Sequence, residues 1–339
     1  MIPMERLPAL CEGSREGAVE GKDDASMKTT EKGKKNKAGS GALSRPAGSA
    51  PLWIACRTLL AGHEEEFFYR WKKVADTFQE DDVHDLRVAS RRLREGLALF
   101  SPCLPAKRSG RVDKEVKKVT RMLGELRNTD EACSFFSALT PQERAHSRHE
   151  IEQLLAALKS EREQAHQKLK KELGSLNPKP LQGEFRSLDS RTNLFRNSAV
   201  DPFMSMACFA GDAIMERAGT LRELLPRAVQ EQDSEAQHLL RIAVKKMRYR
   251  LEIIEPLLRR DYQELHGALK GYQDVLGKLH DIDVFCEMVQ ERLRDGAGRE
   301  ELLRVMAKRR SRLHASFMKK LQSFPIESIG AQARDALRS

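Results

Sequence analysis

The sequence predicts an all-α protein that contains two similar halves of four helices each. Apolar residues recur at helical spacing, and the alternating β-branched runs typical of a sheet are absent. The motif VHDLRVASRRLREGLALF at 83–100 returns as QHLLRIAVKKMRYRLEII at 237–254, a uniform shift of 154 residues. A second pair follows, LGELRNTD from Leu123 and LGKLHDID from Leu276. This repetition indicates an internal duplication, so we expect two pseudo-symmetric four-helix bundles.

The eight helices are expected in the order in which apolar periodicity appears along the chain. They are predicted at 52–78, 83–100, 111–139, 142–173, 203–225, 234–258, 262–294 and 299–322. The SPCLP segment at 101–105 ends the second helix, and NPKP at 177–180 opens a stretch that contains Pro and Gly. Asp81 or Asp82 is placed to cap the first motif helix, and Asp233 or Ser234 the second.

Composition sets the expected domain limits. Residues 1–50 are poor in large apolar side chains and rich in Gly, Ser, Ala and Lys, which predicts a disordered basic tail. The folded domain is expected at 51–325, with a first half at 52–175, a linker at 176–200 and a second half at 201–325. Residues 326–339 are predicted to be a C-terminal tail.

The charge balance favours a protein that meets polyanions. The formal net charge is +10, and residues 1–50 hold nine Lys or Arg against seven Asp or Glu, so +8 belongs to residues 51–339. No apolar run approaches the roughly 18 residues that a membrane span requires, and none resembles a signal peptide. We therefore expect a cytoplasmic protein without a membrane partner.

One face of each motif helix concentrates this positive charge. On a helical wheel the first stripe holds His84, Arg87, Arg91 and Arg94, the second holds His238, Arg241, Lys245 and Arg248, and each is roughly 15 Å long. The opposite faces, predicted to be buried, hold Leu86, Ala89, Leu93, Leu97 and Phe100 and the matching Leu240, Ala243, Met247, Leu251 and Ile254. Glu252 lies near the second stripe, placed to neutralise part of it. A solvated face is the ordinary interpretation of one such helix, but two copies of a cationic face without internal partners indicate an external anion.

These strings resemble the CHAD domain, the conserved histidine α-helical domain, over about residues 52–325. The resemblance rests on the H-x-x-R strings that begin at His84 and His238 and on the two LG elements that follow them. It implies an all-helical, duplicated module that binds inorganic polyphosphate along a basic groove or pore between its halves. The implied binding residues are His84, Arg87, Arg91, Arg92, Arg94, His238, Arg241, Lys245, Lys246, Arg248 and Tyr249, with Arg127 and His280 as secondary residues. Asn128 stands where the family usually has an acid, which weakens any symmetric metal site.

The sequence favours noncatalytic binding, with no cofactor and no metal ligand assigned. Asp130, Asp281 and Asp283 are interpreted as internal partners of cations or as caps, and Mg²⁺ ligation stays open as the alternative. GYQDVLGK at 271–278 fails as a Walker motif, and the cationic stripes lack the carboxylates that phosphate-transfer enzymes use to hold metal. Two alternative functions stay open: nucleic-acid binding, and a helical scaffold for a protein partner. Association with polyphosphate granules would follow from the leading interpretation.

Overall fold

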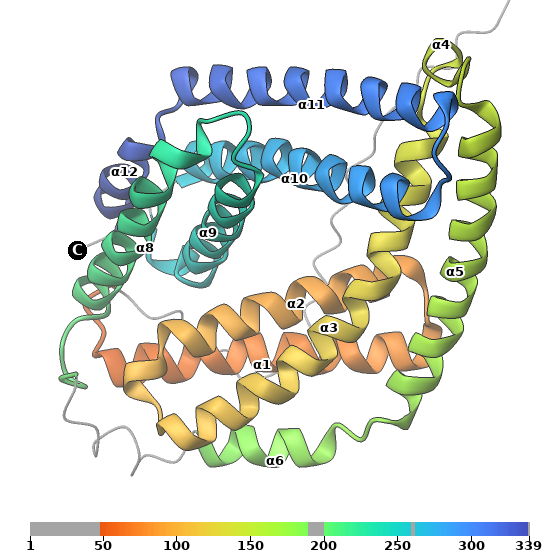
Figure 1. Ribbon diagram of the computed structural model, residues 1–339. Coiled ribbons are helices and arrows are strands. Elements are labelled where there is room, and N and C mark those ends of the chain that lie inside the picture. The colour runs from red at the N-terminus through yellow and green to blue at the C-terminus, as the bar shows by residue number, and fades with distance from the viewer. Residues whose placement is uncertain (1–47, 189–199, 259–261, 338–339) are drawn as a thin grey trace, which may run out of the picture. The chain divides into compact units, whose positions relative to one another are not determined.

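A computed structural model describes residues 48–188, 200–258 and 262–337, and within these ranges the chain is helical. In the first half the helices are α1 (Leu52–Thr77), α2 (Glu80–Leu99), α3 (Ala106–Ser137), α4 (Pro141–Arg144), α5 (Arg148–Ser175) and α6 (Lys179–Leu188). In the second half they are α8 (Met206–Ala228), α9 (Ser234–Ile253), α10 (Tyr262–Arg292), α11 (Ala297–Ser323) and α12 (Ile329–Asp335). The all-α prediction is confirmed (Figure 1).

The duplication is visible in the backbone of the two motif helices. Moving the bounds of α2 by 154 residues gives 234 and 253, which are the bounds of α9. Each helix is followed by a short 3-10 helix, Ser101–Cys103 and Glu255–Leu257, again 154 residues apart. Proline occupies the second position of both 3-10 helices, where it cannot continue the preceding α-helix. The repeated sequence therefore produces a repeated local structure.

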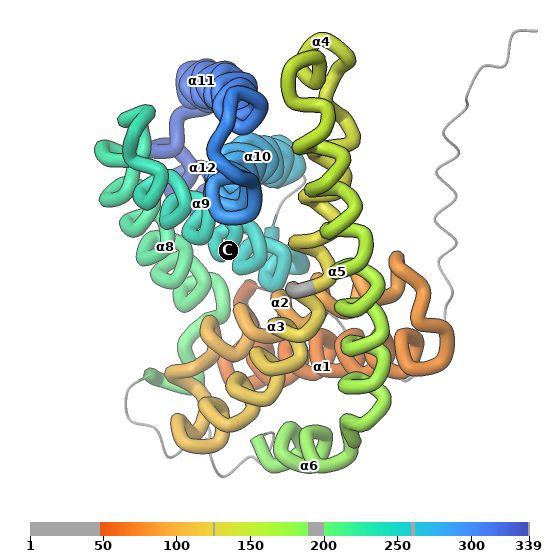
Figure 2. The backbone as a smooth tube through the Cα atoms, turned by 45° about the vertical axis from the view of Figure 1, so that its right-hand side comes forward, coloured from red at the N-terminus to blue at the C-terminus, as the bar shows by residue number. Residues whose placement is uncertain are grey.

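The predicted apolar faces form the core. All ten apolar residues assigned to the buried faces of the two motif helices are at most 7% exposed. The larger hydrophobic cluster contains buried residues of both halves, and a second cluster joins α3 and α5 to α10 and α11. In Figure 2, α5 lies beside α3, and α11 beside α10. The two predicted bundles are not confirmed as separate units, because both clusters draw on both halves.

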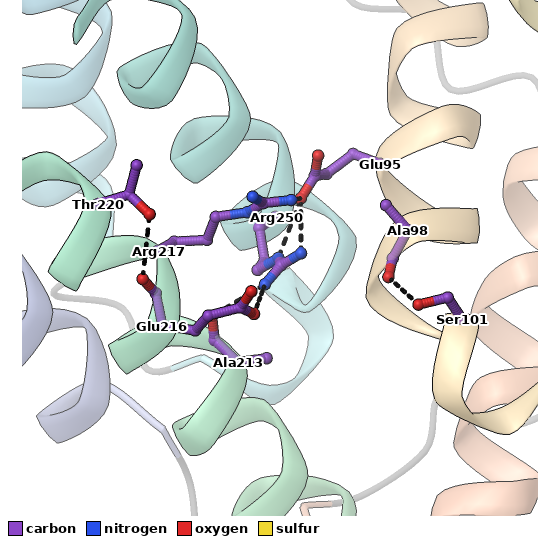
Figure 3. A network of polar contacts seen from close by, with 8 residues as sticks. All are labelled: Glu95, Ala98, Ser101, Ala213, Glu216, Arg217, Thr220 and Arg250. Carbon is purple, nitrogen blue, oxygen red and sulfur yellow. Dashed lines mark hydrogen bonds and ion pairs between the residues drawn. The ribbon is translucent and has the colours of Figure 1, made fainter.

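A buried ion-pair network connects the halves across the core. Glu95 of α2 accepts hydrogen bonds from Arg217 Nη2 of α8 at 3.0 Å and from Arg250 Nε of α9 at 3.0 Å (Figure 3). Arg250 also donates to the carbonyl of Ala213 and to Glu216, at 2.9 and 3.2 Å. Because Arg250 is 3% exposed and Glu95 6%, each charge depends on its partners to offset the loss of hydration.

Three segments differ from the sequence prediction. The helix expected at 142–173 is two helices, because Thr140 and Glu143 form a capping box around the short α4 and a turn follows before α5. The linker predicted at 176–200 contains α6, which buries Leu181, Phe185 and Leu188. Residues 326–337 of the predicted tail form a 3-10 helix and α12, which contact α8 through buried apolar side chains. Most of the N-terminal tail, residues 1–47, lies outside the described residues, as do 189–199 of the linker and 338–339.

Candidate functional site

The site is built on the two motif helices, which contact each other in the interior. Gly96 of α2 lies at this contact, where a Cβ would be in ordinary van der Waals contact with Leu60 at 3.5 Å and with Ile253 of α9 at 3.9 Å. The prediction that Asp81 or Asp82 caps α2 is wrong, because the N-cap is Gln79 and both acids lie in the first turn, where they favour the positive end of the helix dipole. The prediction for α9 is confirmed, because Asp233 accepts from the backbone N–H of Ala236 at 2.9 Å. Helices α3 and α10 pack against α2 and α9 respectively and contribute the remaining side chains.

Five cations from the two motif helices form what we call the cation cluster. Its members are Arg87 and Arg91 of α2 and Arg241, Lys245 and Lys246 of α9. None of the five forms an ion pair with any residue that the structure describes. Arg87 is only 5% exposed, Arg91, Arg241 and Lys245 are half-buried, and Lys246 is exposed. The cluster therefore gathers positive charge from both repeats without neutralising it.

The pKa values show that these cations act on one another across the repeat boundary. Burial, together with Arg91 and Arg127, lowers the pKa of Arg87 to about 9. Burial, followed by the neighbouring Arg91 and Arg241, lowers the pKa of Lys245 to about 7. Burial also lowers the pKa of Arg241, although Asp281 opposes the shift. A bound anion would reverse these shifts, because it favours the charged form of each group.

Three predicted site residues of the motif helices are already neutralised. The pairing of Arg248 with Glu252 was expected, and the other two pairs correct the expectation that the cationic faces lack internal partners. Arg92 Nε lies 2.6 Å from Glu252 Oε2, and Arg248 Nη1 lies 2.5 Å from Glu252 Oε1. Arg94 Nε lies 2.9 Å from Asp113 Oδ1 on α3. Each of these three arginines is paired with a carboxylate, so its charge is less available to an external anion than the charges of the cation cluster.

The predicted aromatic and histidine residues have different environments. Tyr249 is 4% exposed, with the Arg248 guanidinium 4.7 Å from its ring centroid, so it presents no open ring face. The Nδ1 atoms of His238 and His280 lie 3.0 Å apart. Burial, then His238 and the cations Arg241 and Lys245, lower the pKa of His280 to about 4. His84 is exposed, and its pKa is lowered by partial burial and by Arg87.

Two carboxylates from α3 and α10 accompany the cations, and one of them, Asp281, was predicted as an internal partner of a cation. Glu131 of α3 lies 2.5 Å from Arg127 Nη2 and is hydrogen bonded to Asp281 of α10. Burial, followed by the negative charge of Glu131, raises the pKa of Asp281 to about 6. Glu131 follows Arg127 by four residues, a helical ion-pair spacing that would have identified it in the sequence.

The other acids predicted as internal partners do have cationic partners. Asp130 pairs with Arg162 of α5. Asp283 Oδ1 accepts from Arg310 Nε of α11 at 2.6 Å, and Arg310 also donates to Gln237 at 2.9 Å. Within the described ranges, no three His, Cys, Asp or Glu side chains gather as a metal site would require. Mg²⁺ ligation by these acids stays a prediction without structural support.

Two clefts meet at the cation cluster. The small cleft, of about 370 Å³, is lined by Arg87, Arg91 and Arg241, by His280 and by Asp281. The large cleft, of about 870 Å³, lies between α2 and α3 on one side and α10 and α11 on the other. Arg87, Arg127, Glu131, Asp281 and Phe285 line both clefts, so the two are adjacent.

The fold and this site define a helical, internally duplicated protein with an unneutralised cation cluster where its two motif helices meet. The family model of the CHAD domain matches residues 58–290, well over half of the chain, and the chain belongs to that family. It is similar to the crystal structure of the CHAD domain from the plant Ricinus communis, with 22% identity, a TM-score of 0.53, and coverage of 88% of this chain and 96% of that one. It is also similar to PptA from Streptomyces chartreusis, with 16% identity, a TM-score of 0.54, and coverage of 84% and 100%. These likenesses concern the fold. No curated protein matches the chain significantly.

None of the helices that the structure describes is both long and apolar enough to cross a membrane. This result agrees with the sequence, in which no sufficiently long apolar run occurs.

Proposed function

We propose that this protein binds inorganic polyphosphate, without catalysis, through the cation cluster. The supporting observation is that Arg87, Arg91, Arg241, Lys245 and Lys246 come from both repeats and form no ion pair within the described residues. Half-buried cations that repel one another are unfavourable unless an anion joins them. A flexible chain of phosphates matches this need, because guanidinium forks and ammonium groups both bind phosphate oxygens.

Nucleic acid is the main alternative, since its phosphates carry the same charge. Sequence-tolerant binders of single strands usually stack bases on exposed aromatic rings. Tyr249 is the aromatic residue of the predicted site, and its burial to 4% exposure removes it as a stacking platform. The small cleft that holds Arg87, Arg91 and Arg241 therefore favours a polymer of phosphates alone.

Noncatalytic binding fits the state of the nearby acids. Phosphate-transfer enzymes use carboxylates to hold metal ions beside the phosphate. Glu131 is engaged by Arg127 and Asp281, so these acids are committed to contacts within the protein. Association with polyphosphate granules in the cytoplasm is part of the same proposal.

A calorimetric titration with long-chain polyphosphate tests the proposal. The double variant Arg87→Glu with Arg241→Glu should lose most of the affinity, because it replaces two central cations with anions. The matched control is Arg148→Glu with Arg304→Glu, which changes the net charge equally. Those side chains are 81% and 64% exposed and lie on the outer faces of α5 and α11. Equal losses in both double variants would show that only net charge matters and would contradict the assigned site.

Salt dependence and competition separate the remaining alternatives. By analogy with single-stranded nucleic acid, log K should fall by about 0.7 per phosphate contact for each unit of log salt concentration. Polyphosphate that is displaced readily by RNA at equal phosphate concentration would favour the nucleic-acid alternative. In cells that contain polyphosphate granules, the Arg87→Glu, Arg241→Glu variant should disperse from them, whereas a protein scaffold would keep its localisation.

A further inference from the structure

The large cleft has a lining that inorganic polyphosphate does not need. Its wall includes Val83 of α2, Leu123 and Leu126 of α3, and Ile282 and Phe285 of α10. A phosphate chain presents only charged oxygens and gains nothing from contact with these side chains. Each of these five side chains is at most 7% exposed, but the surface that the cleft presents is mainly apolar. The lining therefore favours a ligand that carries an apolar or aromatic group.

The phosphate end of such a ligand has a defined place. Arg87 and Arg127 line both the large and the small cleft, so a ligand in the large cleft reaches the cation cluster without leaving the protein surface. His84, Lys278 and Arg312 add exposed basic groups along the same wall. At the end that the two clefts share, Arg127 is paired with Glu131 and Asp281 also lines the wall, so Arg87 is the cation that can receive an anionic group there.

The other end of the cleft has features that suit a planar base. The half-buried ring of Phe135 lies against Phe285, which is 4% exposed and presents no open ring face, and the Arg309 guanidinium lies 5.5 Å from the Phe135 centroid. Phe135 and Arg309 are therefore the groups that can contact a base. Arg309 is held in place by Glu143, with nitrogen to oxygen distances of 2.7 and 2.6 Å. Aromatic rings and guanidinium planes are the usual stacking partners of nucleobases.

A polar group among the apolar ones favours a nucleoside over an alkyl chain. The exposed hydroxyl of Ser134 lines the same cleft. It can donate a hydrogen bond to a base or accept one from an exocyclic amino group, whereas an alkyl chain would offer it no polar partner. A volume of about 870 Å³ also lies within the range of sites for small molecules.

We propose that the large cleft binds a nucleoside polyphosphate, with the base between α3, α10 and α11 and the phosphates on Arg87. This inference goes beyond the proposed function, and only its phosphate end rests on it. The ligand would share Arg87 with polyphosphate, so the two would compete. The cleft would then give a protein that binds a phosphate polymer a second, organic phosphate ligand.

Calorimetry with ATP and inorganic tripolyphosphate, without divalent cations, tests this inference. Tripolyphosphate carries no fewer charges than ATP, so ionic attraction alone gives ATP no advantage. The inference predicts that ATP binds about tenfold more tightly, in keeping with the stacking of one base. Ser134→Trp should remove this advantage and keep tripolyphosphate binding, because Ser134 is exposed and an indole there would fill the cleft. The control, Ser137→Trp, lies on the same helix away from the cleft and should retain the advantage.

Each result decides between the two proposals. Tripolyphosphate binding with no tighter binding of ATP would overturn the nucleoside site and leave polyphosphate binding intact. The same ratio of affinities in the wild type and in Ser134→Trp would also overturn the nucleoside site. Failure of ATP to bind would overturn the nucleoside site, whereas failure of long-chain polyphosphate to bind would overturn the proposed function.

Discussion

Polyphosphate binding should weaken as pH rises from 7 to 8, and Lys245 is the residue that causes it. Burial among Arg91, Arg241 and Arg87 lowers the pKa of this ammonium group to about 7 in the free protein. At pH 7 about half of the molecules therefore carry a neutral Lys245, and at pH 8 about nine tenths do. A bound polyanion favours the charged form and raises the pKa of Lys245, so binding takes up protons.

The expected magnitude follows from these protonated fractions. If the complex holds Lys245 protonated, the apparent affinity should fall about fivefold between pH 7 and pH 8, with uptake of about half a proton at pH 7. Isothermal titration at constant ionic strength measures the affinity. Repeating the titration in buffers of different ionisation enthalpy measures the proton uptake. The internal phosphates of the polymer stay ionised throughout, so the slope belongs to the protein.

Lys245→Arg is the control, because a guanidinium remains protonated across this range. It should bind like the wild type at pH 6 and lose most of the slope between pH 7 and 8. Other groups also weaken binding as pH rises, but they titrate at lower pH. Asp281, with a pKa raised to about 6, gains a negative charge, and His238 and His280 lose their positive charge. A variant that keeps the full slope between pH 7 and 8 would refute the role of Lys245.

Three further predictions concern affinity and stability. In titrations at pH 7, Arg91→Ala should weaken polyphosphate binding more than Lys245→Ala. A guanidinium binds phosphate through two parallel N–H groups, whereas Lys245 is only half protonated at this pH. Equal losses would contradict this ranking. Arg87→Met should raise the free energy of unfolding by about 1 kcal/mol in urea denaturation, because it replaces a buried cation that has no ion-pair partner among the described residues. The same variant should bind polyphosphate more weakly. Glu95→Ala should lower the free energy of unfolding by about 3–5 kcal/mol, because Arg250 would keep a buried charge without its main partner. A loss below about 1 kcal/mol would contradict this and show that water or Glu216 compensates for the lost carboxylate.

Much of the fold could be predicted from the sequence, because long amphipathic helices have a strong periodic signal. The bounds of α2 and α9 even reproduce the shift of 154 residues. The helices that sequence reasoning missed are short and lie beside proline or glycine, where the surrounding residues suggest a linker or a tail. Their periodicity was nevertheless present: Leu181, Phe185 and Leu188 in α6 are four and three residues apart, and Ile329 and Ala333 in α12 are four apart.

The cationic face of each motif helix was predictable, but the state of each charge was not. A helical wheel places Arg87 and Arg94 on one stripe, and in the structure Arg94 pairs with Asp113 of α3 while Arg87 lines a cleft together with Arg241 of the second repeat. That difference depends on which helix packs beside each residue, which the spacing within α2 cannot reveal. The partner of Arg92, Glu252, lies 160 residues away in the sequence.

The paired and the unneutralised cations have complementary roles on the same two helices. Glu95 of α2 holds Arg250 of α9, and Glu252 of α9 holds Arg92 of α2, so two reciprocal ion pairs connect the repeats. All four residues lie toward the C-terminal ends of their helices, whereas Arg87 and Arg241 lie nearer the N-terminal ends. Like charges facing each other would otherwise favour separation of the helices. The ion pairs and the shared apolar core oppose that separation, and this is why the cation cluster can remain open to an anion from outside.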